Sequence, residues 1–201
     1  MVFDNTDLDS VVHPITYMNK LLFSGGKTME LWNVIEQEMI YSFSFKSEIE
    51  CVVQSPVIDI VAVGCADGTI HLVNLLYDEV LFTFTQKEGS ITAISFLTDS
   101  TLGLSLMAST CQTSGRIVFW DLNARKIWSE MEALHSGRAI NSLAFISNEP
   151  VLVSASEDDN SLKMWLFEKG QSQPRLLKER CGHAEAPHMI RFYGGLDDPT
   201  M

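Results

Sequence analysis

The feature that most constrains this chain is a short residue pattern that occurs four times along it. In each copy a two-residue turn begins six residues before an apolar anchor residue. The copies are GGKTMELWNV (25–34), ADGTIHLVNL (66–75), TSGRIVFWDL (113–122) and DDNSLKMWLF (158–167), with anchors at Trp32, Val73, Trp120 and Trp165. The turn pairs contain Gly, Asn and Asp, which tolerate the left-handed backbone of a tight hairpin. Each copy therefore predicts a hairpin whose second strand carries the anchor.

Each copy lies within a longer unit that contains four apolar runs. A run ending in small residues precedes each turn, a further run precedes that one, and a fourth follows the anchor. In the third unit these runs are SITAISFL (90–97), LMAST (106–110), the anchor strand and KIWSEM (126–131). The anchors are 41, 47 and 45 residues apart. This period, with Trp-Asp at 120–121, is typical of a blade of a WD-type β-propeller.

The run Ile117–Trp120 is apolar at every position, so both faces of its strand must be covered. In a propeller the sheets stand face to face around an axis, and each inner strand is covered by the blades before and after it. Small residues fit where the blades converge. The predicted fold class is therefore all-β: a WD40-type β-propeller with about four and a half blades of four antiparallel strands.

We divide the chain into an acidic lead, the blades and a short tail. The lead is 1–12, the blades are 13–47, 48–87, 88–134 and 135–180 with the start of a fifth at 181–194, and the tail is 195–201. This number of blades does not close a ring of the usual size, and open blades would expose unpaired backbone and apolar faces. The sequence thus predicts a partial propeller whose remaining blades come from a longer chain or a second copy.

The fourth repeat carries a set of polar residues that needs a choice between two interpretations. His135, Ser154 or Ser156, Asp159 and Trp165 resemble the His-Ser-Asp-Trp hydrogen-bond set of WD blades. The same residue types could suggest a catalytic triad, but no GxSxG nucleophile elbow or oxyanion motif accompanies them. We therefore predict a structural role and no enzyme activity.

Other residues are predicted to serve the blades in the same way. Trp32, Trp120, Asp121 and Asp67 occupy anchor or turn positions, and His183 in the CysGlyHis triplet marks the start of a fifth blade with its first strand at 188–194. Cys181, His183 and His188 have the wrong number and spacing for a closed zinc site. No metal and no cofactor are expected.

Charge and hydropathy exclude some classes of partner. The formal net charge is −12, which argues against direct binding to nucleic acid, because such proteins usually carry a basic surface. No apolar run approaches the length of about 18 residues that a transmembrane helix needs. The start MVFDNTDLDS lacks the layout of a signal peptide. These features predict an intracellular protein without membrane contact.

Several stretches of the chain, taken in order, suggest a more specific family. They are HPITYMNK (13–20), LWNV (31–34), PVIDIVAVG (56–64), SITAISFLTD (90–99), SNEPVLVS (147–154), WLFE (165–168) and CGHAEAPHMIRFYG (181–194). This succession resembles the tandem-propeller WD-repeat family of the small-subunit processome, the nucleolar particle that assembles on pre-ribosomal RNA. The resemblance covers residues 13–194.

The resemblance implies a non-catalytic scaffold in the nucleus and nucleolus that supports pre-rRNA processing and 18S rRNA maturation. Its implied partners are other WD-repeat proteins of a multiprotein complex, with indirect association with pre-rRNA and the small nucleolar ribonucleoprotein. The alternative is a WD-repeat adaptor for ubiquitin-ligase substrate recognition or trafficking. Such an adaptor would bind a basic peptide at a propeller mouth lined by Lys46, Arg138, Glu157 and Asp158.

Overall fold

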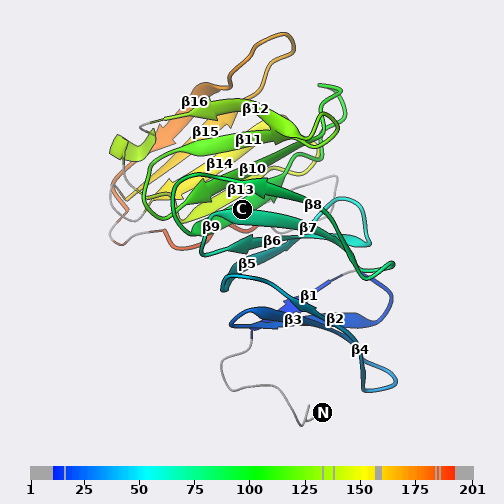
Figure 1. Ribbon diagram of the computed structural model, residues 1–201. Helices are drawn as coiled ribbons and strands as arrows, with labels where there is room; N and C mark the ends of the chain where they lie inside the picture. Colours follow the sequence, from blue (N-terminus) through cyan, green and yellow to red (C-terminus); the bar gives the residue numbers. More distant parts are fainter. Residues whose placement is uncertain are drawn as a thin grey trace. The chain divides into compact units, whose positions relative to one another are not determined.

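The computed structural model describes residues 11–15, 17–132, 134–137, 139–156, 160–183, 185 and 187–192. These residues form four antiparallel sheets, each with four strands in chain order (Figure 1). The chain divides into two compact units, Met1–Thr85 and Gln86–Met201, and each unit holds two sheets. The all-β prediction is confirmed, and we refer to the sheets as blades one to four.

The first unit contains blades one and two. Blade one consists of β1 (Val11–Pro14), β2 (Lys20–Gly25), β3 (Thr28–Asn33) and β4 (Glu38–Ser44). Blade two consists of β5 (Ile49–Gln54), β6 (Ile60–Cys65), β7 (Thr69–Asn74) and β8 (Glu79–Thr85). A buried cluster draws on both blades, with Leu22 and Leu31 from blade one and Val61 and Val73 from blade two.

The second unit contains blades three and four. Blade three consists of β9 (Ile91–Phe96), β10 (Leu106–Cys111), β11 (Ile117–Asp121) and β12 (Lys126–Met131). A 3-10 turn, η1 (Leu134–Gly137), precedes blade four, which consists of β13 (Ser142–Phe145), β14 (Val151–Ser156), β15 (Ser161–Leu166) and β16 (Arg175–Arg180). Within the described residues, no helix has the length and apolar character that crossing a bilayer requires.

Blades three and four pack face to face along their first strands. Thr92 Oγ1 donates to the Ile140 carbonyl at 2.8 Å, and the Phe145 N–H donates to Ser95 Oγ at 2.9 Å. Between the sheets, the ring of Phe167 meets that of Phe119 edge to face, with centroids 5.2 Å apart. This packing covers one face of blade three. In β11, Ile117, Val118 and Phe119 are almost completely buried, as the unbroken apolar run predicts.

A β-bulge falls at the same place in all four blades. The pairing between the third and fourth strands shifts immediately before the anchor, at Leu31/Trp32, Leu72/Val73, Phe119/Trp120 and Met164/Trp165. A bulge raises the local twist of the strand pair and re-aims the side chain beside it. The anchor spacing read from the sequence therefore corresponds to a repeated backbone feature.

Three of the four turn pairs before the anchors adopt the left-handed backbone that their composition predicts, and the Ser114-Gly115 pair of blade three does not. Gly26, Gly68 and Asn160 have φ of +54°, +83° and +48°. These left-handed values suit Gly and Asn and are strained for most other residues. The hairpins of blades one, two and four therefore depend on their Gly or Asn.

The end of the chain departs from the prediction of a first strand of a fifth blade at 188–194. The described part of this stretch, 187–192, forms no strand. A strand forms only when a second strand supplies hydrogen bonds, and none of the described residues supplies one here. The Ile190 N–H instead donates to Ser142 Oγ at 3.0 Å, and Ile190 packs with Val151 and Val153 on blade four.

The other end differs slightly from the predicted boundary. β1 begins at Val11, inside the stretch 1–12 assigned to the lead, because Val11 and Val12 already pair with Ser24 and Phe23. Residues 1–10 and the predicted tail 195–201 lie outside the described residues. The remaining blade boundaries stay predictions.

Candidate functional site: the polar side chains of the blades

In blade four a chain of hydrogen bonds joins three of the residues singled out in the sequence. His135 Nε2 lies 2.7 Å from Ser154 Oγ, and Trp165 Nε1 donates to the same oxygen at 2.9 Å. His135 and Ser154 are completely buried. η1 thus supplies the imidazole, β14 the hydroxyl and β15 the indole, so the set ties three segments of the blade together.

Three further residues complete the description of this set. His135 Nδ1 lies 3.0 Å from Ser161 Oγ, a contact that the sequence analysis missed. Ser156, the alternative to Ser154, is also fully buried, at the end of β14. Asp159 lies outside the described residues, as do Arg138, Glu157 and Asp158 of the predicted mouth.

Blade three carries a variant of the same set that the sequence analysis did not find. Trp120 Nε1 donates to Ser109 Oγ at 2.8 Å, and Ser109 Oγ donates to Gln86 Oε1 at 2.8 Å. A usable signal was present, because Ser109 precedes Trp120 by eleven residues, as Ser154 precedes Trp165. Gln86 takes the role of the imidazole, but its Nε2 is buried without a hydrogen-bond partner.

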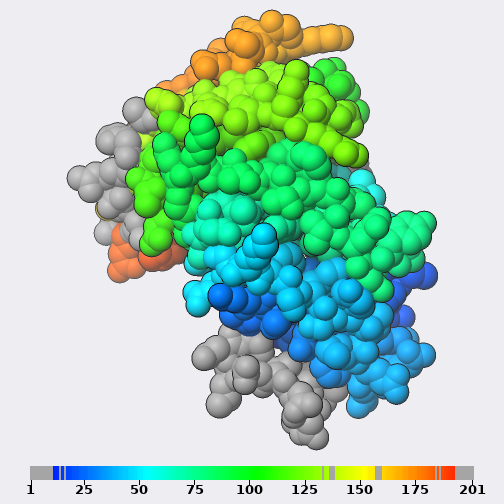
Figure 2. Space-filling view, viewed as in Figure 1, coloured from blue at the N-terminus to red at the C-terminus, as the bar shows by residue number. Residues whose placement is uncertain are grey.

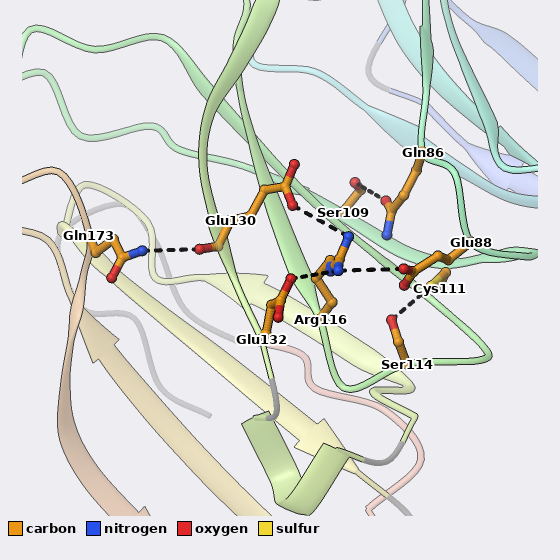
Figure 3. Close-up of polar contacts among 9 residues, drawn as sticks. All are labelled: Gln86, Glu88, Ser109, Cys111, Ser114, Arg116, Glu130, Glu132 and Gln173. Atoms are coloured by element: carbon orange, nitrogen blue, oxygen red, sulfur yellow. Dashed lines mark hydrogen bonds and ion pairs between the residues drawn. The ribbon is translucent and has the colours of Figure 1, made fainter.

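Arg116 stands four residues before Trp120, where blade four has Ser161 before Trp165. Its guanidinium does not turn toward Gln86 but meets three carboxylates, Glu132 at 2.6 Å and Glu88 and Glu130 at 3.4 Å (Figure 3). Partly exposed ion pairs of this kind contribute little each. Together they fasten the segment before β9 to β12.

Two further contacts appear beside Arg116. Cys111 Sγ lies 3.3 Å from Ser114 Oγ, and Gln173 Nε2 donates to the Glu130 carbonyl at 3.2 Å (Figure 3). The second contact links the β15–β16 loop of blade four to blade three. Cys111 is buried, as is Cys65.

The anchor of blade one is surrounded differently. Trp32 is only half-buried; its Nε1 donates to Glu30 Oε2 at 2.9 Å, and its ring meets Phe23 edge to face at 6.2 Å. Phe23 occupies the position of Ser109 and Ser154 relative to the anchor pairing. Blade one therefore holds its anchor by an aromatic contact instead of a buried hydroxyl.

Blade two places its polar contacts at the hairpin. Asp67 Oδ1 accepts from the Thr69 N–H at 3.0 Å and from Thr69 Oγ1 at 2.6 Å. His71 continues this chain, with Nε2 at 3.2 Å from Thr69 Oγ1 and Nδ1 at 2.9 Å from Thr83 Oγ1. Asp67 thus orders the turn before β7 through an Asx-type contact.

The pKa values of Asp67 and His71 both lie below their usual values. Partial burial acts to raise the pKa of Asp67, but the hydrogen bonds from Thr69 outweigh it, so the pKa lies below its usual value. Burial lowers the pKa of His71, and the nearby carboxylate of Asp67 opposes this only in part. At neutral pH, Asp67 is therefore a carboxylate and the imidazole of His71 is uncharged.

Asp121, the Asp of the Trp-Asp pair, orders the turn that follows the anchor strand. Its Oδ1 accepts from the N–H groups of Asn123 at 2.9 Å and Ala124 at 2.8 Å. Asn33 and Asn74 do the same after β3 and β7. His183, by contrast, is exposed and lies in no strand.

Taken together, these groups are arranged to fill and fasten sheets. His135 has no exposed surface, so no dissolved substrate can reach its ring nitrogens in this state, and both nitrogens already contact hydroxyls. Among the residues that the structure describes, no three His, Cys, Asp or Glu side chains gather in a way that could hold a metal ion. The structural role of the set stays a prediction.

Comparison with known proteins places this chain among WD-repeat proteins. Three relatives are similar over nearly all of it: a U3 small nucleolar RNA-associated protein 21 homolog of Schizosaccharomyces pombe (37% identical, 94% of this chain), human WD repeat-containing protein 36 (36%, 96%) and U3 small nucleolar RNA-associated protein 21 of Saccharomyces cerevisiae (30%, 92%). The chain spans only about a fifth of the length of these relatives.

A family model narrows the assignment and agrees with the fold. The model of the WDR36/Utp21 first beta-propeller matches residues 1–168, which include all of blades one to three and most of blade four. The four antiparallel sheets are those of a partial WD40 β-propeller. The chain therefore belongs to the WDR36/Utp21 first β-propeller family.

Proposed function

We propose that this chain is a non-catalytic protein-interaction scaffold of the small-subunit processome. As such, it would support pre-rRNA processing and 18S rRNA maturation in the nucleolus. The observation that carries the proposal is the family membership, together with relatives whose names associate them with the U3 small nucleolar RNA. The geometry agrees with it, because the polar residues that could suggest an active site are used in bonds within blades.

The proposed partners are other WD-repeat proteins of one complex. Contact with pre-rRNA and the small nucleolar ribonucleoprotein would then be indirect, since the net charge of −12 opposes a direct phosphate-binding surface. Blades missing from this chain would be supplied by a longer protein or by a second copy. This proposal accounts for the apolar face of blade four, which Ile190 and Phe192 cover only in part.

Cofractionation tests this proposal. The complete protein is tagged and its sedimentation is compared with that of U3 RNA and pre-rRNA. We expect it in large particles together with other WD-repeat proteins, and depletion should reduce mature 18S rRNA more than 25S or 28S rRNA. Sedimentation as a free small species, or equal loss of both rRNAs, would contradict the proposal. Either of these outcomes would favour the alternative of a WD-repeat adaptor, and an array of basic peptides can test for binding of that kind.

A further inference from the structure

The first unit exposes a group of large apolar side chains at one end of its two blades. Six residues, each more than half exposed, make up what we call the loop patch: Met18, Ile35, Val57, Ile58, Leu76 and Tyr77. They lie in the β1–β2 and β5–β6 loops and in the β3–β4 and β7–β8 turns. Large apolar residues gathered on an otherwise polar surface mark interaction sites in soluble proteins.

Hydrogen bonds hold the loop and the turn of each blade together. In blade one the Val34 N–H donates to the Asn19 carbonyl at 2.9 Å, and in blade two the Leu75 N–H donates to the Asp59 carbonyl at 2.7 Å. Below them, Tyr17 and Leu75 belong to one buried cluster that spans both blades. The β3–β4 and β7–β8 turns lie on the same side of this unit, at the right of the view (Figure 1), and the β7–β8 turn stands out from its surface (Figure 2).

Hydrogen bonds order the backbone of the turns that carry these side chains. Asn33 Oδ1 accepts from the Ile35 N–H at 3.0 Å, and Asn74 Oδ1 accepts from the N–H groups of Leu76 at 2.8 Å and Tyr77 at 3.1 Å. The backbone N–H groups of Ile35, Leu76 and Tyr77 are thus each held by a hydrogen bond. A preorganised apolar surface loses less conformational entropy when a partner binds than a mobile loop does.

Turn geometry alone does not require apolar residues at these positions. The matching turn in blade three, ordered by Asp121 in the same way, carries Asn123, Ala124 and Arg125. Blade four has Asn148 and Glu149 in its β13–β14 loop. Blades one, two and three therefore share this turn, but among the described residues only blades one and two expose large apolar side chains on it.

The charges around the loop patch indicate what kind of partner fits. Glu36 and Asp59 lie in these turns and loops, and Glu38 and Glu79 are the first residues of β4 and β8 directly after the turns. The nearby Lys20 lies over the ring of Tyr17, with Nζ 4.2 Å from its centroid. An acidic rim opposes RNA and anionic lipid, and it opposes the same patch of a second copy, because like charges would meet. A partner with apolar side chains flanked by Lys or Arg is complementary.

We propose that the loop patch docks a basic, amphipathic segment of another protein. Apolar side chains of that segment pack on Ile35, Leu76 and Tyr77, and its cationic residues meet the rim carboxylates. This inference rests on the proposed scaffold role and names the chemistry of one partner. The docking proposal does not require that the scaffold belongs to the processome.

Site-specific photocrosslinking tests the inference in the complete protein. Benzoylphenylalanine replaces Ile35 or Tyr77 in cells, and the crosslinked peptides are sequenced. We expect one recurrent protein segment that carries at least two Lys or Arg beside Leu, Ile, Val or Phe. Ala124, in the matching turn of blade three, is the control position and should not give this product. Crosslinks only to RNA, to a second copy, to segments without this composition or to nothing would overturn the proposal.

A synthetic copy of the recovered segment gives the quantitative test with purified protein. The double variant Ile35→Ser/Tyr77→Ser should weaken its binding at least about tenfold, since central aromatic and aliphatic contacts dominate interface energies. Raising the salt concentration should also weaken binding. The control Ala124→Ser/Arg125→Ser should leave the affinity unchanged. Equal affinity for both double variants would overturn the proposal.

The same experiments separate this inference from the proposed function. The double variant removes exposed side chains, so its melting temperature should match that of the unaltered protein. If the protein sediments with pre-rRNA but yields no basic amphipathic crosslink, the inference fails and the proposed function stands. If the crosslink forms on a protein that never enters such particles, the proposed pathway fails and the docking surface stands.

Discussion

The two units build the same sheet around different interiors. In blades three and four a serine hydroxyl under the anchor accepts the indole N–H, and Gln86 or His135 lies on its other side. In blade one Phe23 takes the place of that serine, and in blade two Val63 does so beside an apolar anchor. A buried polar set and a purely apolar contact can thus fill the same position. The strand pairing and the bulge are therefore common to the blades, whereas the side chains that fill this position vary.

Truncation of the anchors should give the largest effect and should separate the two units. Trp165→Ala removes a buried side chain and leaves a cavity, so we expect the free energy of unfolding to fall by about 3–5 kcal/mol. Trp32→Ala should cost at least about 1 kcal/mol less, because Trp32 is only half-buried. Urea denaturation followed by circular dichroism measures both values. Equal losses would show that the anchors are held alike.

Replacing the shared hydroxyl should give the next largest effect. Ser154→Val leaves His135 Nε2 and Trp165 Nε1 buried without their partner, so the expected loss is about 2–4 kcal/mol in the same assay. Ser154→Thr keeps a hydroxyl and is the matched control. A loss below about 1 kcal/mol for the valine variant would indicate that the bonds of this set contribute little to stability.

Gln86→Leu should have a smaller effect than His135→Leu. Gln86 makes one bond to Ser109 and leaves Nε2 unpaired, so an apolar replacement removes an unsatisfied donor as well as a bond. We expect a change within about 1 kcal/mol, whereas loss of His135 removes its contacts with two serine hydroxyls. Thermal unfolding of the two variants compares them. A greater loss for Gln86→Leu would mean that blade three depends on its set more than blade four does.

The pH dependence should be the smallest effect, and His13 and His71 of the first unit contribute to it. Burial lowers the pKa values of His13 and His71 in the folded state from 6.5, so the unfolded chain binds protons more readily. Their contribution to stability is complete above the unfolded pKa and is lost as the pH falls through the folded pKa. Denaturation curves between pH 8 and 5 should therefore show falling stability. His71→Gln should flatten that slope, and an unchanged slope would contradict the assignment to His71.

Much of the fold follows from local sequence rules. The spacing between turn pair and anchor predicts β2–β3, β6–β7, β10–β11 and β14–β15 as hairpins, and each is present. These contacts are short in sequence, and residues near the turn specify them. The first strand of a fifth blade stays a prediction, since the described residues 187–192 form no strand and have no neighbouring strand among the described residues.

The polar sets were predictable only in part. His135, Ser154 and Trp165 could be identified because their spacing matches a known blade pattern. Gln86 could not, since a glutamine before a strand has no characteristic spacing and its role depends on where Ser109 and Trp120 point. Ser161 and Arg116 occupy the same position relative to the anchor, yet one contacts the imidazole and the other three carboxylates.

The repeated pattern is enough to predict the blade, with its four strands, tight hairpin and anchor, because backbone pairing and side-chain alternation act over a few residues. Which polar groups meet inside each blade, and which apolar residues stay on the surface, follows from how the strands pack. Those outcomes depend on the volume and partners that neighbouring strands leave available. Ser161 and Arg116 occupy matching sites, and their surroundings gave one a contact with an imidazole and the other contacts with carboxylates.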